Sequence, residues 1–178
     1  YSGSGCHCPC GSLFRGREDV YPRRFENRRT GKTGYSPACA NEWVNGICEK
    51  PRVKCANCQH QRFLPVTDDV IRRHLVGKDE LGCRFVAGVY PMLLDEHCYF
   101  LAIDLDKANW QDDSLAVLET CRRLEIPAVL ERSRSGNGAH VWFFFESAVP
   151  ASIARRLGSY VLTETMERRP EIGLDSYD

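Results

Sequence analysis

From residue 84 onward, several short, mostly apolar runs are bounded by turn and polar residues, a pattern that is typical of β-strands. These runs predict strands over residues 84–93, 97–105, 128–132 and 139–146. Between the last two strands, Gly136-Asn137-Gly138 can supply the positive φ angles of a tight turn. The last two strands are therefore predicted to form a β-hairpin.

Apolar residues recur with a period of 3.6 in two other stretches, which predict helices over residues 112–125 and 150–166. A shorter helix is predicted over residues 67–77, with Thr67 as its N-cap and Gly77 at its end. The order of elements favours an α+β fold with a mainly antiparallel sheet and helices on one face. This is the layout of RNA-recognition-motif (RRM) and ferredoxin-like domains.

The chain divides by composition into three parts. Residues 1–36 are rich in Gly, Arg and Ser and predict a basic linker or an extended N-terminal segment, residues 37–66 hold a cysteine module, and residues 67–178 form the predicted catalytic core. The linker-like start suggests a piece of a longer protein, with a core that is truncated at its C-terminal end. No run is long enough to span a membrane and no export signal is visible, so we expect a soluble, cytoplasmic protein.

Charge is distributed unevenly along the chain. Residues 1–78 carry 14 Lys and Arg against 7 Asp and Glu, and the remainder carries 10 against 17. This asymmetry fits a protein that binds a polyanion with its front half and metal with its back half, although chance asymmetry on solvated faces explains it equally well.

Ten cysteines are many for an enzyme of this size. Without an export signal, clustered cysteines indicate metal rather than disulfides. The spacing of Cys39, Cys48, Cys55 and Cys58 predicts a tetrahedral structural zinc site, in which His60 could replace one thiolate. A redox Cys-x-x-Cys pair is the alternative, disfavoured because no strand-then-helix pattern frames it.

The remaining cysteines fall into two groups. A weaker cluster beside His7 is either a disordered tail or part of another metal site: Cys6, Cys8 and Cys10. Three others lie in apolar runs and are expected to be buried, unreactive thiols: Cys83, Cys98 and Cys121.

Two aspartates lie one residue apart at the end of the predicted strand 97–105. Successive side chains of a strand point to opposite faces, so Asp104 and Asp106 should share one face. Two carboxylates held together repel each other unless a cation lies between them, and such oxygen ligands suit Mg²⁺ or Mn²⁺. The alternative is a strand that simply ends in polar residues at the surface.

A second polar motif follows about thirty residues later: Ser135, Gly136, Asn137, Gly138, Ala139 and His140. The turn offers a hydroxyl and backbone N–H groups to an anion, and Arg132, Arg134 and His140 offer charged donors. If strands 97–105 and 139–146 are neighbours, His140 shares a face with the aspartates. Carboxylates that hold metal beside a phosphate cradle fit nucleotidyl transfer with two metal ions.

Together these motifs resemble the archaeo-eukaryotic primase superfamily, whose core is RRM-like. Asp104-Leu105-Asp106 resembles its first motif, and Ser135 to His140 resembles its second, in the form found in polymerase domains of bacterial end-joining ligases. Residues 37–178 look closest to the primase-polymerase domain of TOTE conflict systems, which the Cys39-Ala-Asn-Glu-Trp43 and His74-Leu75-Val76-Gly77 stretches also resemble.

The resemblance implies a DNA primase-polymerase, which would use the Mg²⁺ or Mn²⁺ ions and the structural Zn²⁺ predicted above from the aspartates and the cysteines. Its substrates would be nucleoside triphosphates and a single-stranded DNA template, and its partners helicase and nuclease domains in the same or an associated chain. The family's third carboxylate would be Asp178, with Asp175 as the second choice.

Two other functions remain open at this point. Trp142 and Phe144 could stack bases on an open sheet, as in a non-catalytic single-stranded nucleic-acid-binding module. The same aspartates could also serve a metal-dependent nuclease, which would not need a triphosphate cradle.

Overall fold

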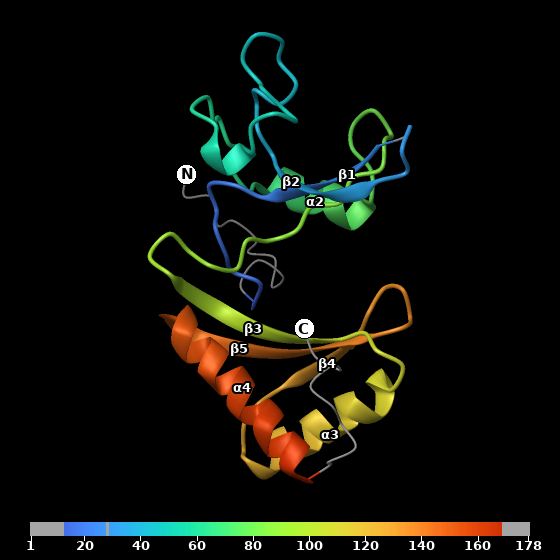
Figure 1. Ribbon diagram of the computed structural model, residues 1–178, viewed down its shortest axis with the longest axis vertical. Coiled ribbons are helices and arrows are strands. Elements are labelled where there is room, and N and C mark those ends of the chain that lie inside the picture. Colours follow the sequence, from blue (N-terminus) through green and yellow to red (C-terminus); the bar gives the residue numbers. More distant parts are fainter. Residues whose placement is uncertain (1–12, 28, 169–178) are drawn as a thin grey trace, which may run out of the picture. The chain divides into compact units, whose positions relative to one another are not determined.

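The computed structural model describes residues 13–27 and 29–168, which divide into two compact units (Figure 1). The first unit is Gly16–Tyr90, and the second comprises residues 91–168 together with residues 13–15.

A two-stranded antiparallel sheet opens the first unit. It consists of β1 (Pro22–Glu26) and β2 (Thr33–Pro37). The turn between them is held by Asn27, whose side-chain oxygen accepts hydrogen bonds from the backbone N–H groups of Arg29 and Thr30 at 3.0 and 3.1 Å. The sequence predicts a basic linker or an extended segment over residues 1–36, and in the structure residues 22–26 of that segment pair with residues 33–37.

The rest of the first unit contains a 3₁₀ turn, η1 (Cys55–Asn57), and the helix α2 (Asp68–Val76). The predicted caps of α2 are confirmed: the Thr67 hydroxyl accepts from the backbone N–H of Val70 at 3.3 Å, and Gly77 ends the helix with a φ of 76°. Helix α2 belongs to this unit, whereas the sequence groups residues 67 onward with the catalytic core.

The predicted strand over residues 84–93 is wrong, because this segment makes only isolated bridges. Ala87 bridges Arg23 of β1, and the backbone N–H of Arg24 donates to the Val86 carbonyl at 2.9 Å. Phe85, only 3% exposed, packs with Tyr21 in the small core of the first unit. The apolar run in this segment therefore reflects packing in this small core and hydrogen bonding beside β1.

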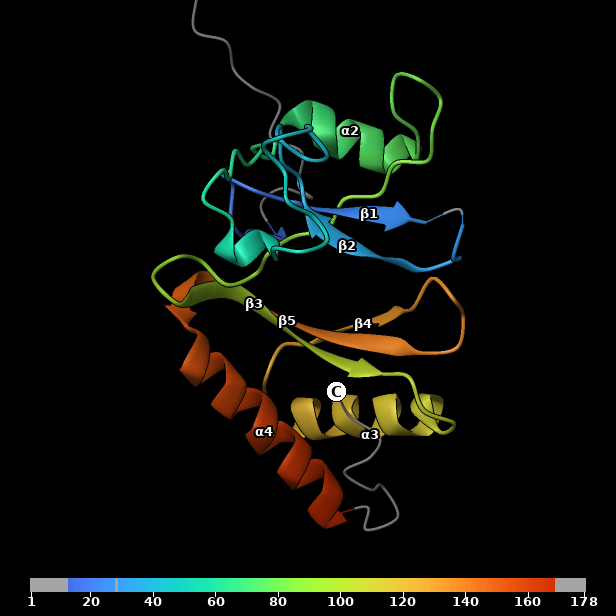
Figure 2. The ribbon, with the colours of Figure 1, turned by 45° about the horizontal axis from the view of Figure 1, so that its top comes forward.

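The second unit contains three strands and two helices in the described residues, in the order β3, α3, β4, β5, α4. Their bounds are β3 (His97–Leu105), α3 (Trp110–Arg123), β4 (Val129–Arg132), β5 (Ala139–Pro150) and α4 (Ala151–Arg168). Strand β5 lies between β3 and β4 and is antiparallel to both. Both helices lie on one side of this sheet (Figure 2).

These elements confirm the strands predicted over 97–105, 128–132 and 139–146, and both predicted helices within a few residues. The described residues therefore show a mixed α+β architecture that follows the first five elements of a split β-α-β layout. The complete RRM or ferredoxin-like sheet stays a prediction, because the described part of this sheet has three strands.

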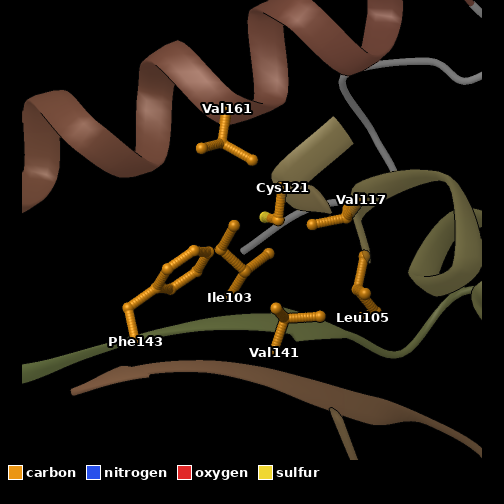
Figure 3. Close-up of a cluster of buried hydrophobic side chains, with 7 residues drawn as sticks. All are labelled: Ile103, Leu105, Val117, Cys121, Val141, Phe143 and Val161. Carbon is orange, nitrogen blue, oxygen red and sulfur yellow. The ribbon is translucent and has the colours of Figure 1, made fainter. Parts of the chain in front are cut away.

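The core of the second unit lies between the sheet and the helices. Seven buried side chains converge there (Figure 3): Ile103, Leu105, Val117, Cys121, Val141, Phe143 and Val161. One buried polar contact joins the two helices, since the Thr165 hydroxyl donates to the Thr120 hydroxyl at 3.0 Å. Alternate residues of β3 and β5 fill this core, so the residues between them face away from the helices.

Two of the three predicted buried thiols are confirmed. Cys98 and Cys121 are buried, and desolvation raises the pKa of each thiol. Cys83 is exposed instead, because it lies in a turn closed by Asp79, whose carboxylate accepts from the Cys83 backbone N–H at 2.9 Å.

Alkylation should separate these thiols. A raised pKa leaves less thiolate at a given pH, so in native protein at pH 7.5 iodoacetamide should modify Cys98 and Cys121 about tenfold more slowly than Cys83, or more slowly still. Peptide mass spectrometry would measure the rates, with urea-unfolded protein as the control in which the three rates converge. Equal rates in the native protein would contradict the burial of Cys98 and Cys121.

Candidate functional site

A row of three polar residues crosses the sheet of the second unit. Asp104 of β3 pairs with His140 of β5, and His140 pairs with Glu131 of β4. Ile103 and Val141, which neighbour Asp104 and His140 along their strands, point into the core. The row therefore lies on the sheet face opposite to the helices.

Contacts along this row are close. His140 Nε2 lies 3.6 Å from Asp104 Oδ1, and His140 Nδ1 lies 3.3 Å from Glu131 Oε2. The side chains of Asp104 and Glu131 are about half exposed, at 51% and 52%, and that of His140 is 30% exposed. A small ligand could reach all three side chains from this face of the sheet in the second unit.

Asp106 is the first residue beyond β3, which ends at Leu105 as predicted. The Asp106 side chain is 54% exposed, and its Oδ1 lies 3.2 Å from Lys107 Nζ. Asp106 therefore offers an accessible carboxylate at the end of the strand.

The loop between β4 and β5 is held by its own hydrogen bonds. The backbone N–H of Gly136 donates to the Ser133 carbonyl at 2.9 Å, and that of Asn137 donates to Ser135 Oγ at 3.2 Å. Gly136 adopts the predicted positive φ, at 79°. Because these two N–H groups are used within the loop, side chains are better placed than this part of the backbone to bind an anion.

Gly138 is required for a different reason from the one predicted. It does not adopt a positive φ, but a Cβ at this position would lie 2.8 Å from the Leu105 carbonyl oxygen and 3.4 Å from Asp106 Cα. The absence of a side chain lets the loop pack directly against the end of β3. This contact brings the second motif to the first.

The two predicted arginines lie in different places. Arg132 pairs with Ala139, which also pairs with the core residue Leu105, and its guanidinium lies over the Trp110 ring at 5.9 Å. It also donates to the Gly136 carbonyl at 3.0 Å. Arg132 thus supports the loop from the helix side, away from His140, whereas Arg134 is exposed in the loop itself.

Aromatic residues occupy the other end of the open face. Trp142 and Phe144 are nearly parallel, with an interplanar angle of 10°. Phe14 packs edge-on against Phe100, Trp142 and Phe144, with ring centroids 5.8, 5.1 and 5.3 Å apart. The surface on which bases were predicted to stack is therefore partly filled by a side chain of the same unit.

Several predicted ligands lie outside the described residues: Asp175, Asp178, Cys6, Cys8 and Cys10. Within residues 13–27 and 29–168, no group of three or more His, Cys, Asp or Glu side chains is arranged so that it could hold a metal ion. The two exposed carboxylates still fit Mg²⁺ chemically, because this ion is usually held by one or two carboxylates together with substrate phosphates.

The four cysteines of the module surround one small pocket of about 20 Å³ in the first unit, which His60 also lines. Backbone N–H groups donate to two of the sulfurs, from His60 to Cys58 and from Arg62 to Cys39, both at 3.4 Å. Such N–H···S contacts are typical of the surroundings of metal-binding thiolates. The donor set therefore fits zinc chemically, although the sulfurs do not converge as a bound ion would require.

Lys50 lies beside this pocket. Burial lowers its pKa, but the hydrogen bond to Glu42 and the interaction with Cys55 outweigh burial, and the net pKa is raised. Lys50 Nζ lies 2.7 Å from Glu42 Oε1, so the ammonium is held in place beside the cysteine pocket.

Glu131 is the residue of this face that sequence reasoning missed. The predicted hairpin contains the information needed to identify it. A loop over residues 133–138 makes Arg132 pair with Ala139, and Glu131 therefore pairs with His140. Counting back from the turn would have identified it.

The sequence matches a known protein family over nearly its whole length. Residues 10–178 match the family described as the archaeo-eukaryotic primase domain of TOTE conflict systems, and the chain belongs to this family. No curated protein matches the chain. Among the described residues, no helix is both long enough and apolar enough to span a membrane.

The contact at Gly138 can be tested by adding one methyl group. Gly138→Ala should lower the free energy of unfolding by about 1–3 kcal/mol, since the new Cβ would overlap the Leu105 carbonyl. Urea unfolding monitored by circular dichroism would measure the change. Asn137→Ala is the matched control, because this exposed loop residue should tolerate the change, and equal stabilities of the two variants would contradict a tight contact.

Proposed function

We propose that this domain is a template-directed nucleotidyltransferase, a DNA primase-polymerase that joins nucleoside triphosphates by two-metal-ion catalysis. The observation that carries the proposal is the pairing of Asp104 with His140 on the open face, beside a hairpin loop that packs against Asp106. Membership of an archaeo-eukaryotic primase family supports the same chemistry.

In this proposal, Asp104 and Asp106 hold Mg²⁺ or Mn²⁺ together with phosphate oxygens of the substrate. Asp178, or else Asp175, completes the carboxylate set. Bound ions of this kind supply activation of the attacking 3′-hydroxyl and stabilisation of the pyrophosphate leaving group. The protein contributes the carboxylates on an ordered strand end, where Gly138 fixes the distance between the two motifs.

The triphosphate is bound by side chains of the hairpin. His140 Nε2 lies 3.6 Å from Asp104, which is too long for a strong hydrogen bond and leaves this nitrogen able to donate to a phosphate oxygen. Ser135 offers its hydroxyl and Arg134 an exposed guanidinium in the same loop. Arg132 contributes indirectly, by holding the Gly136 carbonyl and with it the shape of the loop.

A structural Zn²⁺ ion in the first unit is the second part of the proposal. Cys39, Cys48, Cys55 and Cys58 would bind it as thiolates, and the backbone N–H groups of His60 and Arg62 donate to two of these sulfurs. Such a site would stabilise a unit whose own buried core is small.

The substrates and partners proposed are those that the family implies: nucleoside triphosphates, single-stranded DNA template, and helicase and nuclease domains. A purely nucleic-acid-binding role is less well supported, because Phe14 fills part of the Trp142 and Phe144 surface. Incubation with labelled nucleotide, primed template and Mn²⁺ tests the proposal, since extension, cleavage and simple retention are distinguishable products.

Removing both carboxylates is the most direct test. Asp104→Ala combined with Asp106→Ala should lower primer extension about a thousandfold or more, because several kcal/mol of transition-state stabilisation would be lost. The fold and template binding should survive, since both side chains are half exposed. Glu119→Ala, an exposed carboxylate on the helix side, should extend normally. Full extension by the double variant would refute the proposal.

Metal analysis tests the zinc site. Protein purified without chelator should contain one zinc per chain, with Zn–S distances of about 2.3 Å by X-ray absorption. Cys55→Ser should reduce the zinc content and the stability of the first unit, whereas Cys83→Ser, the exposed control outside the pocket, should change neither. A zinc-free protein with native stability would count against the site.

A further inference from the structure

Glu131 is tied to two ring systems on the open face through one carboxylate oxygen. The indole N–H of Trp142 donates to Glu131 Oε2 at 2.8 Å, and His140 Nδ1 lies 3.3 Å from the same oxygen. An ionised carboxylate only accepts hydrogen bonds, so the contact with His140 requires a proton on Nδ1.

The indole is itself held firmly. Trp142 packs against Phe14, Phe100 and Phe144, with ring centroids between 5.1 and 6.2 Å. Glu131 is thereby anchored to an aromatic cluster, although its own side chain is half exposed. The cluster thus fixes the position of a carboxylate that faces the imidazole.

We infer that Glu131 is a positioning residue: it holds the Nδ1 proton of His140 and orients the ring so that Nε2 faces Asp104. This inference rests on the proposed function for its catalytic meaning. With Nδ1 held by Glu131, the ring presents Nε2 to Asp104 and the predicted triphosphate, and this nitrogen can donate a hydrogen bond whenever the imidazole carries both protons. Glu131 therefore decides which nitrogen meets the substrate.

The residues that contact one another are also neighbours in the sheet. Asp104, His140 and Glu131 are direct cross-strand partners, and Trp142 follows His140 on the same face of β5. A carboxylate that accepts a hydrogen bond from one ring nitrogen commonly fixes the tautomer and the orientation of a functional histidine. The aromatic cluster around Trp142 thus holds Glu131 in place beside His140.

The first readout is the tautomer of His140. Nitrogen-15 NMR of the neutral imidazole at alkaline pH should show the proton on Nδ1 in the unaltered protein and a shift towards Nε2 in Glu131→Ala. Trp142→Phe, which keeps an aromatic ring but removes the indole donor, should shift the tautomer partly. Glu146→Ala, an exposed carboxylate further along β5, is the matched control and should change nothing.

The second readout is the affinity for ATP and dATP, measured by calorimetry in EDTA so that it does not depend on metal or turnover. Glu131→Ala should weaken triphosphate binding about tenfold, approaching the effect of His140→Ala. Glu131→Gln retains an acceptor without the charge and should restore part of both readouts, provided that circular dichroism shows each variant folded.

Three results are decisive. A Glu131→Ala variant that keeps the Nδ1–H tautomer overturns the inference. The inference also fails if His140→Ala weakens triphosphate binding but Glu131→Ala, having lost the Nδ1–H tautomer, binds triphosphate as tightly as the unaltered protein. If His140→Ala itself binds triphosphate normally while Glu131→Ala shifts the tautomer, Glu131 still positions the ring and the triphosphate role in the proposed function fails.

Discussion

The antiparallel register between β3 and β5 is the constraint on which both the core and the site depend. Asp104 pairs with His140 and Leu105 pairs with Ala139. Because side chains alternate along a strand, this one register directs Ile103 into the core and Asp104 to the opposite face. A slip of one residue would exchange the two faces and bury the carboxylate. The hydrophobic burial that stabilises the second unit therefore also holds the polar pair together.

The hairpin loop adds a second constraint at the end of β3. Gly138 allows backbone to approach backbone at Leu105 and Asp106, and Arg132 fixes the Gly136 carbonyl from the helix side. Neither residue needs to touch a substrate to matter, because each sets where the loop side chains lie. The glycine-containing motif, residues 135–140, thus has a structural role as well. It holds His140, Ser135 and Arg134 near the end of β3, next to Asp106.

Much of the second unit could be predicted from the sequence, because its strands and helices have clear periods and a glycine turn. The strands β1 and β2 could not, since their pairing depends on the turn at Asn27 rather than on apolar alternation. The apolar run at 84–93 packs beside β1 without forming a regular strand. In the site, Asp104 and His140 could be found by spacing. Arg132 is close to His140 in sequence but lies on the other face, because it pairs with Ala139, and only the register shows this.

The open face of the second unit therefore has two ends with different physical roles. Phe14 comes from a distant part of the sequence and covers rings at one end, so no local pattern could have placed it there. Covering these rings removes apolar surface from water and immobilises Trp142, whose indole then fixes Glu131. Glu131 in turn contacts His140, which contacts Asp104. The packing of Trp142 in the aromatic cluster therefore helps to orient Glu131 and His140, which lie at the end of the face where the proposed chemistry would occur.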